Sequence, residues 1–158
     1  MNLTTQLAKQ LRDVYFGGNW TGVNLKDSLS GINWQEATTK IYSLNTIATL
    51  VFHMNYYVTA IIGVLEGGPL EAHDKFSFDH PPVVSGQDWE HLKEKTWREA
   101  KQLADLVEQL PEEKWNEDFS ENKYGTYLRN ITGVIEHTHY HLGQIVLIKK
   151  IIQKEPGK

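Results

Sequence analysis

Apolar residues in four separate parts of this chain recur at steps of three or four, the spacing of one face of an α-helix. In the C-terminal part this spacing runs through Val134, His137, His141, Ile145, Ile148 and Ile152, where the two histidines replace apolar residues. We find no convincing alternation typical of a strand. A helix with one apolar face must bury that face against another element. The pattern therefore predicts an all-α fold in which four long helices pack together.

The ends of these helices are marked by residues that cap helices or leave the helical conformation easily. The predicted helices span residues 3–16, 44–65, 86–110 and 127–153. Gly17 and Gly18 follow the first helix, while Ser43, Ser85 and Thr126 are placed to cap the other three. Polar side chains at these positions accept hydrogen bonds from the free amide groups of a first helical turn, so the boundaries agree with the periodicity.

Two long connections separate the predicted helices. The first contains Trp20 and Trp34, which we expect to pack the end of the bundle, and Asn33 is expected to cap a short helical turn there. The second, between helices 2 and 3, is long enough for a crossover or a lid. We interpret its histidines, His73 and His80, as surface-loop residues, since neither has a partner at helical spacing.

Length and composition fit one domain without nucleic acid as a partner. A chain of 158 residues can bury a substantial core, and we predict a single four-helix domain over residues 1–158. Sixteen Lys and Arg against twenty Asp and Glu give a net charge of −4, with no basic run that would follow phosphates. The absence of cysteine excludes disulfides, thiolate ligands and a cysteine nucleophile, so any thiol chemistry requires an external thiol.

The apolar segments favour a cytoplasmic protein without a membrane span. The first sixteen residues lack a continuous apolar core, so we expect no signal peptide. The most apolar segment, residues 47–65, is interrupted by His53, Asn55 and two tyrosines. A spanning helix needs about 20 predominantly apolar residues, so this segment is interpreted as a buried helix of the bundle.

Three histidines interrupt apolar helical stripes and are candidate metal ligands. His137 and His141 lie four residues apart, so a helix places both on one face, one turn apart. His53 interrupts the apolar stripe of the second predicted helix. One such histidine is commonly just hydrogen-bonded within a core, but three that could converge favour a metal site, because imidazole is the commonest transition-metal ligand. His139 points about 200° around the helix from His137 and is excluded.

The C-terminal segment resembles the signature of the DinB-like superfamily, whose last core helix carries His-x-x-x-His-x-Gly-Gln-Ile or Leu. The match is complete at His137, His141, Gly143, Gln144 and Ile145. The loop at residues 20–32 is similar to the loop after the first helix of many members. Residues 43–57 correspond to the part where the family places its first ligand histidine. The resemblance therefore covers most of the chain.

This resemblance implies a four-helix bundle of up-down-down-up order that binds a divalent metal ion through His53, His137 and His141. Three protein ligands leave positions open for water or substrate, the ligand count of a catalytic zinc, nickel or similar ion. We expect a metal-dependent enzyme with a small-molecule substrate, either an S-transferase that uses a low-molecular-weight thiol or a hydrolase. Nothing singles out the thiol pocket of the mycothiol- or bacillithiol-dependent transferases, so both reactions stay open. The resemblance also implies a homodimer.

Two other hypotheses fit the same residues. A non-catalytic bundle could bind a small ligand or a partner and retain the histidines with or without metal. Alternatively, the metal could serve only the fold, in which case a chelator lowers thermal stability and no coordination position is open. Neighbouring polar residues could orient the ligands or be purely structural, and none is assigned as a general base. These neighbours are Asn55, Tyr57, Glu136 and Gln144.

Overall fold

The fold is all-α, as the periodicity predicts. The computed structural model describes residues 2–154, and no strand occurs among them beyond one isolated bridge between Asp118 and Thr126. The α-helices are α1 (Leu3–Phe16), α2 (Leu25–Leu29), α3 (Trp34–Thr38), α4 (Ile47–Leu65), α5 (Gly86–Glu108) and α6 (Tyr127–Ile152). Three short 3₁₀ helices lie in the connections, namely η1 (Asp74–Phe76), η2 (Glu112–Asn116) and η3 (Asn122–Tyr124).

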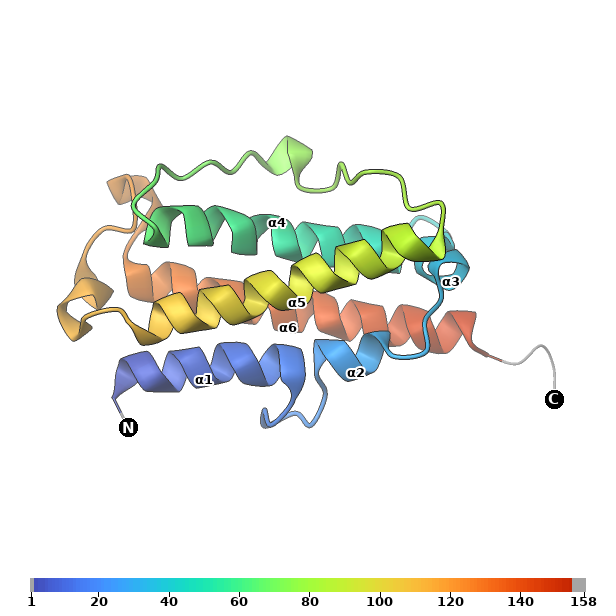
Figure 1. Ribbon diagram of the computed structural model, residues 1–158, viewed down its shortest axis with the longest axis horizontal. Helices are drawn as coiled ribbons and strands as arrows, with labels where there is room; N and C mark the ends of the chain where they lie inside the picture. The colour runs from blue at the N-terminus through green and yellow to red at the C-terminus, as the bar shows by residue number, and fades with distance from the viewer. Residues whose placement is uncertain (1, 155–158) are drawn as a thin grey trace.

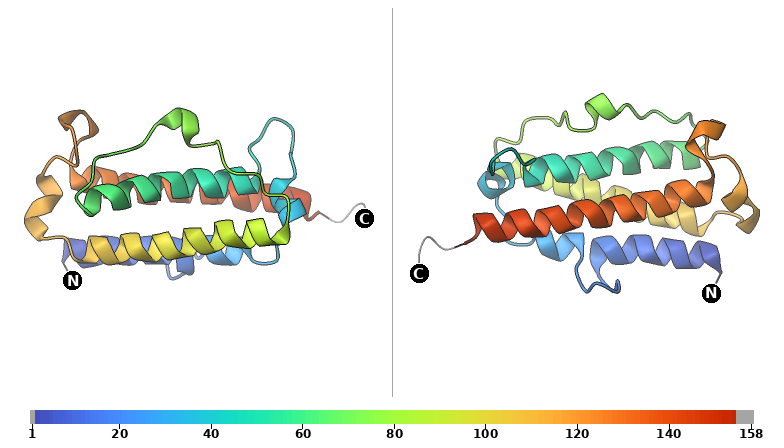
Figure 2. Two further views of the ribbon diagram at one scale, coloured as in Figure 1. Left: turned by 45° about the horizontal axis from the view of Figure 1, so that its top comes forward. Right: turned by 180° about the vertical axis from the view of Figure 1, so that it is seen from behind.

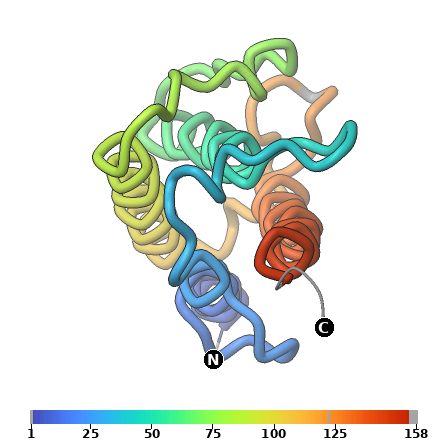
Figure 3. The backbone as a smooth tube through the Cα atoms, turned by 90° about the vertical axis from the view of Figure 1, so that its right-hand side faces the viewer, coloured from blue at the N-terminus to red at the C-terminus, as the bar shows by residue number. Residues whose placement is uncertain are grey.

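The long helices α1, α4, α5 and α6 lie side by side along the molecule (Figure 1). Helix α5 contacts both α1 and α4, and α6 also contacts both α1 and α4, so the four surround a common core, as the end-on view in Figure 3 shows. Helices α4 and α5 run in the same direction, and α1 and α6 run in the opposite one (Figures 1 and 2). The chain between α4 and α5 therefore travels back along the length of α4.

Most helix ends were predicted correctly because their caps are local. The side chains of Ser85 and Thr126 accept hydrogen bonds from the third residue beyond them, at the starts of α5 and α6. The prediction for α4 was wrong: Thr46, not Ser43, is its cap, and the helix begins three residues later than expected. The reason is a turn before the helix, in which the Leu44 amide donates to the Ile41 carbonyl.

The first long connection is more ordered than the sequence indicated. Its short helix α2 was not predicted, although Asn24 caps it and Leu25 and Leu29 are buried. Trp34 is partly buried and packs against the core as expected, whereas the prediction for Trp20 was wrong because its side chain is fully exposed. A tryptophan of α5 packs against this connection instead. Trp89 is buried, and its indole nitrogen donates to the Ile32 carbonyl at 2.9 Å.

Helix α4 is the central element of the core. Among residues 2–154 it is the one helix that is long and apolar enough to cross a membrane, judged by length and composition alone. Two thirds of that apolar stretch is buried inside the protein (67%), which is the pattern of a core helix. Its buried residues face α5 on one side and α6 on the other, so α4 holds His53 inside the packed helices.

Candidate metal centre

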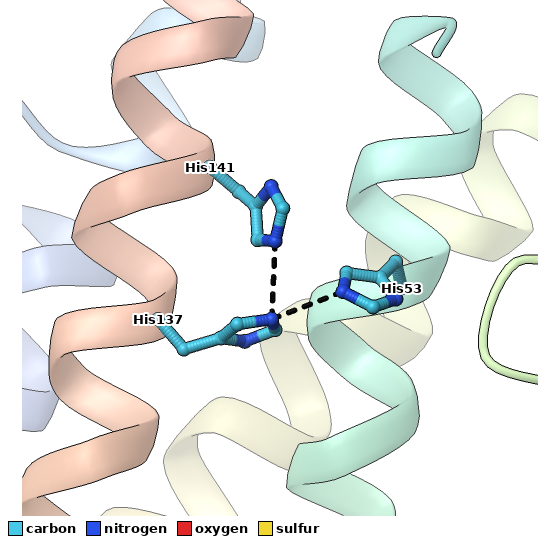
Figure 4. Close-up of side chains that lie close together, drawn as sticks. All are labelled: His53, His137 and His141. Atoms are coloured by element: carbon cyan, nitrogen blue, oxygen red, sulfur yellow. Dashed lines mark hydrogen bonds between the residues drawn. The ribbon is translucent and has the colours of Figure 1, made fainter. Parts of the chain in front are cut away.

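Three histidine side chains from two neighbouring helices meet at one point (Figure 4). The Nε2 atom of His137 lies 3.0 Å from Nε2 of His53 and 3.1 Å from Nε2 of His141. The helical spacing of His137 and His141 places both rings on the face of α6 that contacts α4. His53 and His141 are buried, and His137 is partly buried. The sequence singled out these three residues, and the structure brings them together.

The hydrogen bonds of His53 fix which of its ring nitrogens carries the proton. Its Nδ1 atom lies 3.2 Å from the Ser77 carbonyl oxygen and 3.1 Å from the Ser77 hydroxyl. The hydroxyl donates its own proton to the Asp74 carbonyl, so it can only accept from His53. Nδ1 of His53 is therefore the donor, and in the neutral ring Nε2 presents a lone pair to the centre of the cluster.

Gln144 has the same effect on His141. Its side-chain oxygen Oε1 lies 2.7 Å from Nδ1 of His141, one helical turn away on α6. An amide oxygen can only accept, so Nδ1 of His141 donates and its Nε2 also presents a lone pair inward. Outward partners of this kind fix the tautomer and the ring orientation of metal-ligating histidines. Of the neighbours considered from sequence, Gln144 is the one in contact with a ligand through a hydrogen bond.

The third ring, His137, lacks such an outward partner. Its Nδ1 atom is buried and accepts or donates no hydrogen bond within the described part of the chain. Burial, and then the nearby His141 and His53, together lower the pKa of His137 to about 4. The pKa of His53 is also lowered, first by burial and then by His141. Both rings are therefore neutral at pH 7, which is the form that binds metal.

This donor set fits a divalent ion. The Nε2 lone pairs of His53 and His141 both face Nε2 of His137. A single proton on that nitrogen cannot form a good hydrogen bond to both of them. Tetrahedral zinc with Zn–N bonds of about 2.0–2.1 Å separates its nitrogen ligands by roughly 3.3 Å, so the observed separations of 3.0 and 3.1 Å need only a small opening. All three ligand atoms lie within 4.8 Å of one another. The cluster could hold a metal ion and leave a coordination position free.

The connection between α4 and α5 supplies the outer wall beside His53. The ring of Phe78 stacks on the His53 ring, with centroids 3.8 Å apart and an interplanar angle of 10°. Tyr57 packs its ring edge-on against His53 and His137, and its hydroxyl donates to Asp74 at 2.6 Å. Burial and the bond to Asp74 raise the pKa of Tyr57. The sequence missed Ser77 and Phe78, because residues of an irregular connection carry no periodic signal.

The remaining polar candidates lie outside the cluster. His73 is exposed and His80 hydrogen-bonds to Thr49 at 3.0 Å, so neither joins the three histidines. Glu136 is exposed on the outer face of α6. Asn55 points away toward α5, where its amide nitrogen donates to Glu99 at 2.8 Å. These residues are therefore structural or surface groups in this arrangement.

A cavity of about 330 Å³ opens beside His137, between the N-terminal half of α6 and the C-terminal half of α4. It lies at the lower end of the size range of small-molecule sites. Its walls are Tyr57, Ile61, Arg129, Asn130, Gly133, Val134 and His137.

Comparisons of this chain with protein-family models, with curated proteins and with solved structures found no match.

Proposed function

We propose that this chain is a metal-dependent enzyme of the DinB-like superfamily, with zinc or nickel held by His53, His137 and His141. The signature that ends in Gly143, Gln144 and Ile145 supports this assignment. The directions of the long helices, with α4 and α5 parallel, support the up-down-down-up bundle of that family. The proposal rests on residues and topology together.

The observation that carries the proposal is the inward convergence of three Nε2 atoms whose outer nitrogens are arranged for ligation. Ser77 and Gln144 accept from His53 and His141, so these residues hold two rings in the tautomer that a metal needs. A purely structural core histidine needs only hydrogen-bond partners for its ring nitrogens. Two further histidine nitrogens at 3.0 and 3.1 Å from Nε2 of His137 are not explained by that role. When bound, a divalent ion supplies Lewis acidity, which lowers the pKa of a water or thiol or polarises a carbonyl.

Of the two reactions considered, the surroundings favour transfer of a small thiol over hydrolysis. Activation of water normally uses a general base near the metal, yet no carboxylate belongs to the three-histidine cluster within residues 2–154. The carboxylate of Asp74 accepts the Tyr57 hydroxyl at Oδ1. A thiol loses its proton far more readily than water and needs less help from a base. Since the chain has no cysteine, that thiol is an external small molecule.

Metal content is the first test. Untagged protein purified without chelator is analysed by mass spectrometry as wild type, His53→Ala, His137→Ala and His139→Ala. His139 lies on α6 beside the cluster without belonging to it, so it is the matched control. We expect near-stoichiometric zinc or nickel in the wild type and the control, and its loss from the other two. A wild type that contains no metal and takes up neither ion overturns the proposal.

A second measurement separates an open site from a structural one. Cobalt replaces the native metal, and the visible spectrum is recorded during titration with 2-mercaptoethanol. A spectral change that saturates indicates a coordination position available to a thiol. An unchanged spectrum, together with a large loss of thermal stability on chelation, favours a metal that only stabilises the fold. Metal-free wild type that still binds small molecules in the cavity would instead support the non-catalytic binding protein.

A further inference from the structure

The cavity beside His137 is built on one face of α6. Arg129, Gly133 and His137 are spaced by four residues and all line it, while Tyr57 and Ile61 of α4 form the opposite wall. Eight residues of α-helix span about 12 Å, so the arginine and the three-histidine cluster mark two ends of an elongated space. Apolar side chains lie between these two ends.

The guanidinium group of Arg129 has no carboxylate or other side-chain partner within residues 2–154. Arg12 shows what an arginine elsewhere in this chain does, since it pairs with Asp105 at 2.7 Å and also with Glu108. No acidic residue lines the cavity. Asp74 contacts the lining residue Tyr57 by accepting its hydroxyl, and among the described residues it forms no ion pair with Arg129. The cavity therefore combines one unpaired positive charge, on the exposed residue Arg129, with walls that are apolar at Ile61 and Val134 and polar at Asn130 and His137.

Two glycines shape the surroundings of this charge. Gly125 has φ of +76°, and a Cβ there would lie 2.6 Å from Cδ of Arg129, so the bare backbone leaves room for the arginine stem. Gly133 lies inside α6, where glycine costs roughly 1 kcal/mol relative to alanine. A Cβ on Gly133 would meet no atom within 4 Å, so packing does not require the glycine. Its missing side chain enlarges the cavity.

We infer that this cavity binds a small organic anion whose acidic group pairs with Arg129 and whose apolar body lies against Ile61 and Val134. Arginine binds carboxylate and phosphate groups through two parallel hydrogen bonds, which gives orientation as well as affinity. The other end of the molecule then faces His137. That last step rests on the proposed function, because it makes the anion the substrate of the metal centre; anion binding by Arg129 does not depend on metal.

Matched acids and amides test the charge requirement directly. Butanoate, hexanoate and 3-phenylpropionate, each with its primary amide, are titrated calorimetrically into metal-free and zinc-loaded protein. We expect at least one acid to bind the metal-free protein ten times or more as tightly as its amide. Arg129→Gln should remove this preference, Arg129→Lys should retain part of it, and Arg98→Gln, on the exposed face of α5, should leave it unchanged.

A steric variant locates the binding site. Gly133→Leu directs a side chain into the cavity and should weaken acid and amide alike, with a melting temperature no lower than that of the wild type. Equal binding of acid and amide, an acid affinity unaffected by Arg129→Gln, or no binding of any acid overturns the inference. Metal-free protein that binds an acid through Arg129 but takes up no zinc or nickel refutes the metalloenzyme proposal alone.

Discussion

Gln144 offers the sharpest test of the metal centre, because it touches a proposed ligand without being one. Its Oε1 atom lies 2.7 Å from Nδ1 of His141. Gln144→Leu removes this acceptor and frees the His141 ring to rotate or change tautomer. Outer partners of ligand histidines are typically worth a factor of 10–100 in metal affinity, or about 1.4–2.7 kcal/mol. We therefore expect zinc binding to weaken by this factor.

Gln144→Glu should act in the opposite direction. A carboxylate accepts a stronger, charge-assisted hydrogen bond from His141 and makes its Nε2 more basic. Zinc affinity is measured by competition with a chromophoric chelator at pH 7.5. The order expected is Glu above Gln above Leu at position 144. Gln102→Leu, which removes a hydrogen bond to Glu66 at the C-terminal end of α4, is the control and should leave zinc affinity unchanged.

Thermal unfolding of the metal-free proteins separates ligation from folding. Gln144 is partly exposed, and a single hydrogen bond contributes about 0.5–1.5 kcal/mol to stability, so metal-free Gln144→Leu should melt close to the wild type. The difference between the two should grow when zinc is added. Equal zinc affinity in wild type and Gln144→Leu would refute the reasoning, as would a loss of stability as large without zinc as with it.

Three further predictions concern stability. Gly133→Ala should stabilise the protein by about 0.5–1 kcal/mol in urea unfolding, because helical glycine is costly and the site has room for a methyl group. Trp89→Phe should cost about 1–3 kcal/mol by the same assay, since the buried Ile32 carbonyl loses its donor. Burial raises the pKa of Glu99, but hydrogen bonds from Lys95, Thr59 and Asn55 outweigh it and hold the pKa below 4.5. Stability from Glu99 is therefore present above pH 4.5 and is lost as pH falls through the folded pKa. The melting temperature, measured at a series of pH values across this range, should decrease less steeply for Glu99→Gln than for the wild type.

The long helices could be predicted because their signals are local. Apolar spacing identifies the buried face, and a hydroxyl such as that of Ser85 or Thr126 marks the first turn. At the start of α4 the local signals do not decide which residue caps the helix. Ser43 and Thr46 are equally good capping residues, and only the turn formed before the helix excludes Ser43. Trp20 shows the same limit, because its type predicts burial but its loop exposes it.

The candidate site divides in the same way. The positions of His137 and His141 on one face of a helix follow from their spacing, since the periodicity of α6 is regular. Their meeting with His53 is a tertiary contact, which the apolar stripes made possible and the family resemblance predicted. The lack of a hydrogen-bond partner at Nδ1 of His137 depends on side-chain rotamers. The inward direction of the Nε2 lone pairs of His53 and His141 depends on the partners of their outer nitrogens. No sequence pattern specifies those.

Topology explains why the unpredicted part of the site comes from a loop. Parallel α4 and α5 require the connection to run back along the outside of α4 (Figure 2). Contacts follow this path, with His73 against Tyr56, Ser77 against His53, and His80 against Thr49, at steps of about one helical turn. A short turn joining α4 to α5 would reverse α5 and leave Nδ1 of His53 without the Ser77 acceptor. The crossover is therefore part of the candidate metal centre, because the same path that sets the helix direction also fixes the tautomer of His53.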